Sequence, residues 1–224
     1  MPLRKDHKKP QGSSYRQRQV GTMEEIERFL IISEGAETER RYFQRFDAPG
    51  TVVLAVGTGM NTLSLVDEAV RVRDVEARRL RKLAASFDEC WCVFDRDSFA
   101  RDNFNNAVRK AETAGFQVGY SNQCFELWYV LHFRRVEAAL HRTQYYEILA
   151  TELGRRYDKA DDRVYDELTI READAIRNAA HLHAQFGNIP PEQKDPCTTV
   201  HILVERLRRS ARRMKSRRRL EPLK

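Results

Sequence analysis

Three carboxylate residues follow apolar, strand-like segments of this sequence, in a pattern suited to metal-dependent chemistry. Glu34 comes directly after the segment FLIIS, and Asp95 and Asp97 follow the segment CWCVF. Residues two apart in extended geometry project to the same side, so both aspartates can face one ion. Because several carboxylates at the rim of a sheet repel one another, a hard divalent cation would relieve that repulsion. Oxygen-only ligation, with no His or Cys nearby, favours Mg²⁺ or Mn²⁺ over Zn²⁺.

A divalent cation at this position suits phosphoryl chemistry. It can polarise a phosphoryl group, lower the pKa of a bound water and stabilise the leaving oxygen. Gly35 lets the backbone turn after Glu34 and approach a ligand closely. An Asp-x-Asp after a strand also fits a solvated loop, but its pairing with the earlier Glu34-Gly35 favours a metal site. The sequence therefore predicts an acidic Mg²⁺ site, with Glu34, Asp95 and Asp97 as catalytic residues, that cuts or otherwise processes phosphodiester bonds.

Three further residues are candidates for the same site. Glu126 lies in the apolar stretch CFELWYVLHF, where a carboxylate needs a partner. It either adds a metal ligand or holds a basic residue near the metal, and the alternative is a structural salt bridge or cap. Lys159 can contribute a cation from a later segment, although an exposed loop explains it equally simply. Arg96 should point away from its flanking aspartates, to contact a nucleic-acid phosphate or to pair with a carboxylate.

Two pairs of polar residues have simpler structural interpretations. Glu37 and Glu39 fall in the first turn of an expected helix, where negative charge suits the helix dipole. Ser121 and Asn122 are expected to cap the N-terminus of the helix that follows them.

The C-terminal end of the chain is strongly basic, and the formal net charge of the whole chain is +7. Only Glu205 and Glu221 oppose its basic residues. A positive surface of this kind attracts phosphate backbones through counterion release, so we expect contact with DNA or RNA. The alternative is a solvated tail that aids solubility. The residues expected to contact nucleic acid are Arg96, Lys159, Arg208, Arg209, Arg212 and Arg213.

The elements that must position these residues alternate between strand and helix patterns. Apolar runs predict strands at 29–32, 51–56, 90–94 and 116–120, and helical spacing predicts helices at 38–46, 62–84, 103–114 and 125–133. Later helical patterns cover 143–156, 170–186 and 198–215. This alternation predicts an α/β fold with a parallel sheet, right-handed crossovers and an α-helical C-terminal part. In such a sheet, ligands bind outside the carboxyl ends of the strands.

The expected organisation has four parts: a basic disordered tail (1–24), an α/β domain (25–135), a helical C-terminal part (136–215) and a basic tail (216–224). No run of about 18 apolar residues exists, so no membrane span is expected. The N-terminal residues lack the apolar core of a secretory signal, and we expect a cytoplasmic protein. The four cysteines match no zinc template and should be buried thiols.

Glu-Gly after the first strand and Asp-x-Asp after a later one resemble the signature of the TOPRIM fold, a parallel sheet sandwiched by helices. The segments IISEGAETERRYF, CWCVFDRD, SNQCFELWYVLHF and DPCTTVHILVERL resemble, more closely, the RloB-like family of phage-defence and abortive-infection proteins. The resemblance covers roughly residues 27–210. Its most specific part is Ser-Asn-x-Cys-Phe-Glu-Leu-Trp, and its one departure is Gln123, where the family usually has proline. This departure should change the turn more than the chemistry.

The resemblance implies a TOPRIM-type nuclease that defends against foreign nucleic acid, often linked to an AAA-type ATPase encoded as a separate chain. It gives Glu34 the position of the general acid/base and Asp95 and Asp97 the metal-ligand positions. Two alternatives stay open. One is a non-catalytic module that binds nucleic acid or the ATPase partner and senses infection, and the other is primase-like nucleotidyl transfer. The second is weaker because no zinc-binding template module is recognisable. A homo-oligomer is compatible with the sequence.

Overall fold

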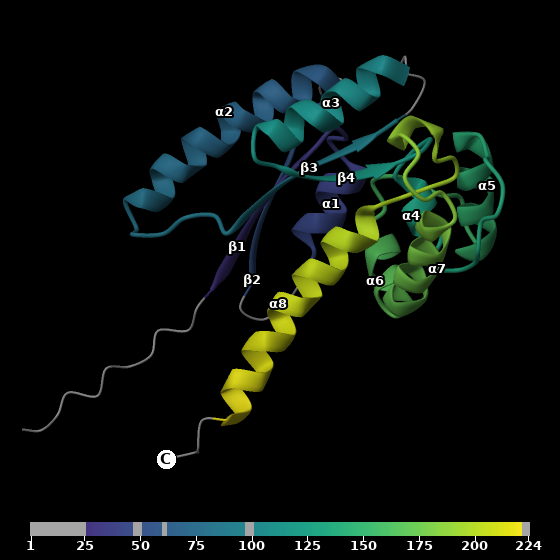
Figure 1. Cartoon of the computed structure of the whole chain (residues 1–224). Coiled ribbons are helices and arrows are strands. Elements are labelled where there is room, and N and C mark those ends of the chain that lie inside the picture. The colour runs from purple at the N-terminus through teal and green to yellow at the C-terminus, as the bar shows by residue number, and fades with distance from the viewer. Residues whose placement is uncertain (1–25, 47–50, 60–61, 97–100, 221–224) are drawn as a thin grey trace, which may run out of the picture.

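The centre of the fold is a four-stranded parallel sheet, with strand order β2-β1-β3-β4 (Figure 1). A computed structural model describes residues 26–46, 51–59, 62–96 and 101–220 of the chain, and the side chains within these ranges except those of 62, 63, 101, 102 and 213–220. The strands are β1 (Glu27–Ser33), β2 (Thr51–Gly57), β3 (Glu89–Asp95) and β4 (Gln117–Ser121).

The central strand β1 is buried on both faces, which explains its unbroken apolar run. The side chains of residues 29–32 are fully buried. The register pairs Ser33 with Gly57 on one side and with Val93 on the other, and it pairs Asp95 with Ser121. The carboxyl ends of all four strands therefore lie at one edge of the sheet, which is where the candidate catalytic residues follow β1 and β3.

Helices cover both faces of the sheet. Those within the sheet region are α1 (Thr38–Gln44), α2 (Thr62–Arg81), α3 (Arg101–Thr113) and α4 (Glu126–Val130). Helices α2 and α3 lie side by side over one face (Figure 1), where Leu65 and Phe104 pack with Leu30 and Ile32 of β1. The opposite face of β1 contributes Phe29 to a second cluster, which continues into α1 and α4.

The C-terminal part is helical. It comprises α5 (Arg142–Glu152), α6 (Arg163–Thr169), α7 (Glu172–Ala184), a short 3₁₀ turn η1 (Pro191–Gln193) and the long α8 (Val200–Leu220). Helix α8 runs across the sheet face that also carries α1 (Figure 1). Its Arg206 forms ion pairs with Glu27 of β1, at 2.8 Å, and with Glu89 of β3, so it joins the helix to two strands.

The expected α/β fold with a helical C-terminal part is confirmed, and the differences are local. Helix α4 is shorter than expected because the chain after Val130 tightens into i→i+3 hydrogen bonds, from His132 N to Tyr129 O and from Phe133 N to Val130 O. Helix α6 was not expected. Only Val164 and Leu168 of its seven residues are buried, so its apolar pattern is too short to predict a helix from the sequence. Helix α8 ends later than expected, at Leu220.

The four cysteines are free, as expected. Cys92, Cys124 and Cys197 are buried, as the sequence predicted, whereas Cys90 is only half-buried. None of the helices in the described ranges has both the length and the apolar character that crossing a membrane requires.

Candidate functional site

Glu34 is fixed by backbone hydrogen bonds where β1 ends. Its N–H donates to the carbonyl of Val93 on β3 at 3.0 Å, and its carbonyl accepts from the N–H of Gly59 at 2.9 Å. The residue is therefore held between the neighbouring strand and the loop after β2. Glu34 lines a cavity at the carboxyl edge of the sheet.

Asp95 reaches the same cavity from the end of β3. Its Oδ2 accepts a hydrogen bond from the N–H of Phe125 at 3.1 Å, whereas its buried Oδ1 has no hydrogen-bond partner among the described residues. Burial raises the pKa of Asp95 well above its usual value, and the nearby charges of Glu39, Glu126 and Glu34 raise it further. Asp95 therefore has one buried carboxyl oxygen that no described protein group pairs.

The cavity has a volume of about 290 Å³ and brings together residues far apart in the sequence. Its carboxylates are Glu34, Glu37 and Glu39 from the β1–α1 region, Asp95 from β3 and Glu126 from α4. Two cations from the helical part, Arg142 and Lys159, also line it. The structure thus brings Glu34, Asp95, Glu126 and Lys159 to one place, and the negative side chains outnumber the positive ones.

Sequence reasoning did not assign Glu37, Glu39 or Arg142 to this site. Of the two missed carboxylates, Glu37 is exposed and Glu39 is the more deeply placed. Its side chain is 5% exposed, and its carboxyl packs so closely on Gly35 that a Cβ added there would lie 1.9 Å from Oε2. Burial, with the charge of Glu126 adding to it, raises the pKa of Glu39 to about 7. A signal was available, because Glu39, Tyr42 and Phe43 share one helical face and the aromatic pair marks that face as buried.

Glu126 is held by two residues of the α5–α6 connection. It is 1% exposed, and its Oε1 accepts from the Tyr157 hydroxyl at 3.0 Å and from Lys159 Nζ at 3.2 Å. Partial burial disfavours the charge of Lys159, but the interactions with Glu126 and Tyr146 together outweigh it and raise the pKa of Lys159 above its ordinary value. Of the roles expected for Glu126, the structure places a basic residue beside it at the cavity.

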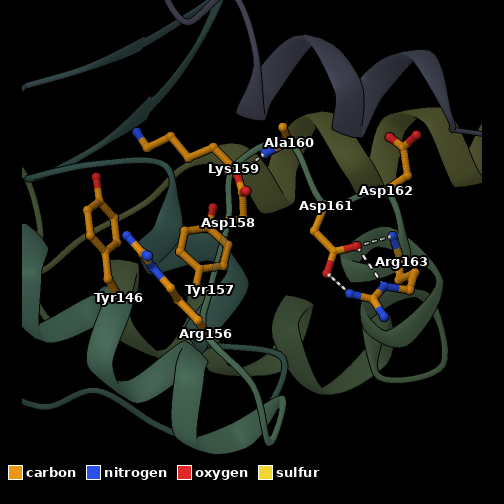
Figure 2. Close-up of a pocket in the computed structure, with 9 residues that line it drawn as sticks. All are labelled: Tyr146, Arg156, Tyr157, Asp158, Lys159, Ala160, Asp161, Asp162 and Arg163. Carbon is orange, nitrogen blue, oxygen red and sulfur yellow. Dashed lines mark hydrogen bonds and ion pairs between the residues drawn. The ribbon is translucent and has the colours of Figure 1, made fainter.

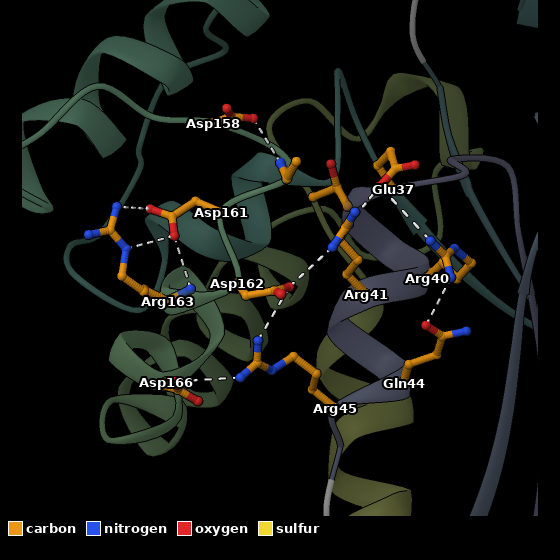
Figure 3. A network of polar contacts seen from close by, with 12 residues as sticks. Glu37, Arg40, Arg41, Gln44, Arg45, Asp158, Asp161, Asp162, Arg163 and Asp166 are labelled. Atoms are coloured by element: carbon orange, nitrogen blue, oxygen red, sulfur yellow. Dashed lines mark hydrogen bonds and ion pairs between the residues drawn. The ribbon is translucent and has the colours of Figure 1, made fainter.

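A network of ion pairs anchors the segment that carries Lys159 (Figure 3). Asp162, at the start of α6, lies 3.1 Å from Arg41 and 3.3 Å from Arg45, both on or next to α1. Arg41 also pairs with Glu37 at 2.6 Å, and this pairing lowers the pKa of Glu37. The helix that follows Glu34 and the segment that carries Lys159 are thus tied to each other.

Three expected polar residues lie elsewhere. Arg96 is not among the residues that line the cavity; its Nη1 lies 3.9 Å from Oδ2 of Asp195, which matches the carboxylate pairing weighed for it. The capping role expected for Ser121 and Asn122 is wrong, because α4 begins at Glu126 and its N-cap position is occupied by Phe125. Asn122 Nδ2 instead donates to the carbonyl of Pro191 at 3.1 Å, and the Ser121 hydroxyl bonds that of Thr198.

The basic residues of α8 divide into two kinds. Arg208 forms a bidentate pair with Glu172 of α7, with both distances 2.7 Å, and its guanidinium lies over Phe46. Arg209 and Arg212 are exposed and line a hollow of about 310 Å³ between α7 and α8. The side chain of Arg213 lies outside the described part of the chain. The basic surface that nucleic acid can reach on this helix therefore includes Arg209 and Arg212.

The described ranges contain no group of three or more His, Cys, Asp or Glu side chains placed to hold a metal ion. Asp97, an expected ligand, lies outside those ranges. The donor chemistry nevertheless fits a hard cation, because Asp95 Oδ1 is buried without a partner and the facing carboxylates repel each other. Glu34, Asp95 and Glu126 line the cavity that would receive such an ion, but they are not placed as a three-ligand group.

Comparison with protein families gives one match. A family model described as RloB-like protein matches residues 29–207, which spans the sheet, the acidic cavity and most of the C-terminal helices. Comparison with curated proteins and with solved structures finds no match.

Proposed function

The chain belongs to the RloB-like protein family, and on that premise we propose that it is a Mg²⁺- or Mn²⁺-dependent nuclease or related phosphodiester-processing enzyme. We place its activity in defence against foreign nucleic acid, with DNA or RNA as the substrate class. A separate AAA-type ATPase is the partner chain that the proposal allows for.

The observation that carries this proposal is the uncompensated Asp95 carboxylate in a cavity shared with Glu34, Glu39 and Glu126. Burying like charges together costs free energy unless a cation or a proton compensates them. A protein gains nothing in stability from this arrangement alone. Clusters of titratable groups with perturbed pKa values in a cleft are typical of functional sites.

The residues of the acidic cavity have different roles in the proposed reaction. When bound, a divalent cation would supply charge stabilisation for the phosphoryl oxygens and a more acidic water. Glu34 takes the role of general acid/base, because it stands at the cavity rim on a backbone fixed from both sides. Asp95 and Glu126 present oxygen ligands. Lys159, half exposed and beside Glu126, offers an ammonium to a substrate phosphate.

The proposal is tested by cleavage assays on labelled DNA and RNA, single- and double-stranded, with Mg²⁺, with Mn²⁺ and with EDTA. We expect Glu34→Gln and Asp95→Asn each to lower the cleavage rate by at least about 100-fold, the usual loss when a positioned acid/base is removed. Glu147→Gln is the matched control, because Glu147 is exposed on α5 and does not line the cavity.

Each assay is run with and without the cognate ATPase, so that an activity requiring the partner is not missed. Circular dichroism of each variant shows whether the fold survives. Cleavage at the wild-type rate in both folded site variants would remove the catalytic assignment.

One observation favours a second candidate function. Glu126 already has a cation beside it, and the described residues provide no ready three-ligand metal group. A non-catalytic module that senses infection would need only a binding surface, such as the exposed Arg209 and Arg212 on α8. Nucleic-acid binding without turnover, under every metal and partner condition, identifies this alternative.

A further inference from the structure

A second, larger hollow is drawn in Figure 2. Lys159 lines both this hollow and the acidic cavity. The volume of the hollow is about 810 Å³, within the usual range of small-molecule sites. The residues that line it include Tyr146, Arg156, Tyr157 and Lys159. If a phosphodiester of a bound molecule lies in the acidic cavity, the adjacent part of that molecule would lie at this hollow.

The three carboxylates of the hollow are already engaged by the protein. Asp158 Oδ1 accepts from the N–H of Ala160 at 2.9 Å, within its own loop. Asp161 accepts from Arg163 and from Arg155, each at 2.9 Å. Asp162 is held by the arginines of α1 described above. Asp161 and Asp162 are therefore paired with arginines, and Asp158 is the carboxylate of the hollow that has only a backbone hydrogen bond among the described residues.

The cation Arg156 has the opposite character. It is exposed, and within the described residues it makes no hydrogen bond or ion pair. In Figure 2 the Asp161–Arg163 pair lies on the other side of the hollow from Arg156 and Tyr146. A guanidinium without a protein partner, beside a site for phosphodiesters, is suited to accept a phosphate oxygen in bidentate geometry.

Aromatic surface lies next to this cation. The ring centroids of Tyr146 and Tyr157 are 5.6 Å apart and the rings are tilted by 38°, and Tyr146 is half-buried. Lys159 Nζ lies 5.5 Å from the centre of the Tyr146 ring. Aromatic rings beside basic groups are the usual surface on which unpaired bases stack.

We propose that this hollow binds the nucleotide adjacent to the scissile phosphodiester of a single-stranded nucleic acid, with Arg156 on its phosphate and Tyr146 against its base. The inference rests on the proposed function, which it deepens by naming the substrate class. A base within a duplex is stacked and paired, and cannot enter a concave site without first leaving the helix. The site therefore selects unpaired segments, in DNA or in RNA.

Binding is measured with the full chain in EDTA, so that the readout does not depend on metal-dependent turnover. The probes are fluorescein-labelled 12-mers of one mixed sequence, as single-stranded DNA, single-stranded RNA and the corresponding duplex, followed by fluorescence anisotropy across a salt series. We expect at least one of the two single-stranded probes, DNA or RNA, to bind at least about tenfold more tightly than the duplex, as stacking of one or two bases implies.

Two variants separate the phosphate contact from the base contact. Arg156→Ala should weaken single-strand binding and lower the slope of log K against log salt by about 0.7, the value for one phosphate contact on a single strand. Tyr146→Leu should weaken binding about tenfold and leave the slope unchanged, because stacking releases no counterion. Arg135→Ala is the matched control, since Arg135 is exposed and lies outside the hollow.

The outcomes for this inference and for the proposed function are distinct. Arg156-dependent binding of single strands by a chain that cuts no substrate supports the hollow as a nucleotide site and overturns the enzymatic proposal. Cleavage that persists while Arg156→Ala binds like Arg135→Ala overturns the inference alone. Equal affinity for duplex and single strand, or no measurable binding of either single strand, overturns it as well.

Discussion

At the scale of single residues, the position of Glu39 depends on the absence of a side chain at position 35. A Cβ on Gly35 would overlap the Glu39 carboxyl, with 1.9 Å to Oε2 and 2.5 Å to Cδ. Glu39 is buried, so its carboxyl has little room to move aside. The glycine after Glu34 therefore serves the packing of a second carboxylate, in addition to allowing the chain to turn.

This contact gives a double-mutant prediction. Gly35→Ala should destabilise the fold by about 1–3 kcal/mol, as expected for overpacking, and Glu39→Ala in the same chain should recover most of that loss. The free energy of unfolding is measured by urea denaturation for both single variants and the double variant. If the two substitutions change the free energy of unfolding additively, steric overlap between position 35 and the Glu39 carboxyl is not the cause of the loss.

His132 gives a pH dependence that is separate from the acidic cavity. The residue is 2% exposed, one ring nitrogen lies 2.9 Å from the carbonyl oxygen of Trp128, and burial lowers the pKa of His132 to about 4. In the unfolded chain its pKa returns to about 6.5. Above pH 6.5 the imidazole is neutral in both the folded and the unfolded chain, so the stability is fully present. As the pH falls from 6.5 towards 4, the unfolded chain takes up a proton that the folded chain does not, and the free energy of unfolding decreases.

We expect the wild-type chain to lose stability between pH 7 and pH 5, with His132 contributing about 2 kcal/mol of that loss. His132→Phe keeps a ring of similar size and removes the titration, so it should make the curve of unfolding free energy against pH flatter. Urea denaturation at several pH values checks this. An equally steep curve in the folded variant would assign the loss to other groups.

At the scale of elements, the sequence was most informative where burial is extreme. The segments of β1 and β3 are apolar without interruption, so both strands, and the carboxylates that follow them, could be predicted. Tyr157 could not be foreseen as a partner of Glu126, because the contact joins residues far apart in the chain and depends on how α5 and α6 pack. Glu39 was assigned to the helix dipole, although its spacing from Tyr42 placed it on the buried face.

Helix α8 shows how the helical part is attached to the sheet. Leu207 is fully buried in the cluster that also contains Phe29 of β1, whereas Ile202 on the same helix is 41% exposed. Leu207→Ala should lower the free energy of unfolding by about 2–5 kcal/mol through lost burial and a residual cavity. Ile202→Ala is the control, and it should cost less than about 1 kcal/mol. Equal losses in urea denaturation would contradict this packing.

At the scale of the whole molecule, the acidic cavity is shared between the sheet and the helical part. Glu34 and Asp95 come from strand ends, whereas Arg142 and Lys159 come from beyond α4. One hydrophobic cluster continues from Phe29 and Trp91 of the sheet through Trp128 of α4 to the C-terminal helices. The relative placement of strand ends and the α5–α6 connection therefore depends on the packing of the whole chain, which no local pattern in the sequence specifies.

The proposed site requires Glu34 and Asp95, with Glu126, to coordinate one hard cation. The most direct measurement is a crystal structure of the full chain with Mn²⁺, with anomalous data collected above and below the manganese absorption edge, beside an Asp95→Ala crystal treated identically. We predict an anomalous peak in the cavity, within about 2.0–2.6 Å of carboxylate oxygens of Glu34 and Asp95, that is lost in Asp95→Ala. A wild-type crystal with no peak in the cavity, or with the same peak retained in Asp95→Ala, would contradict the claim.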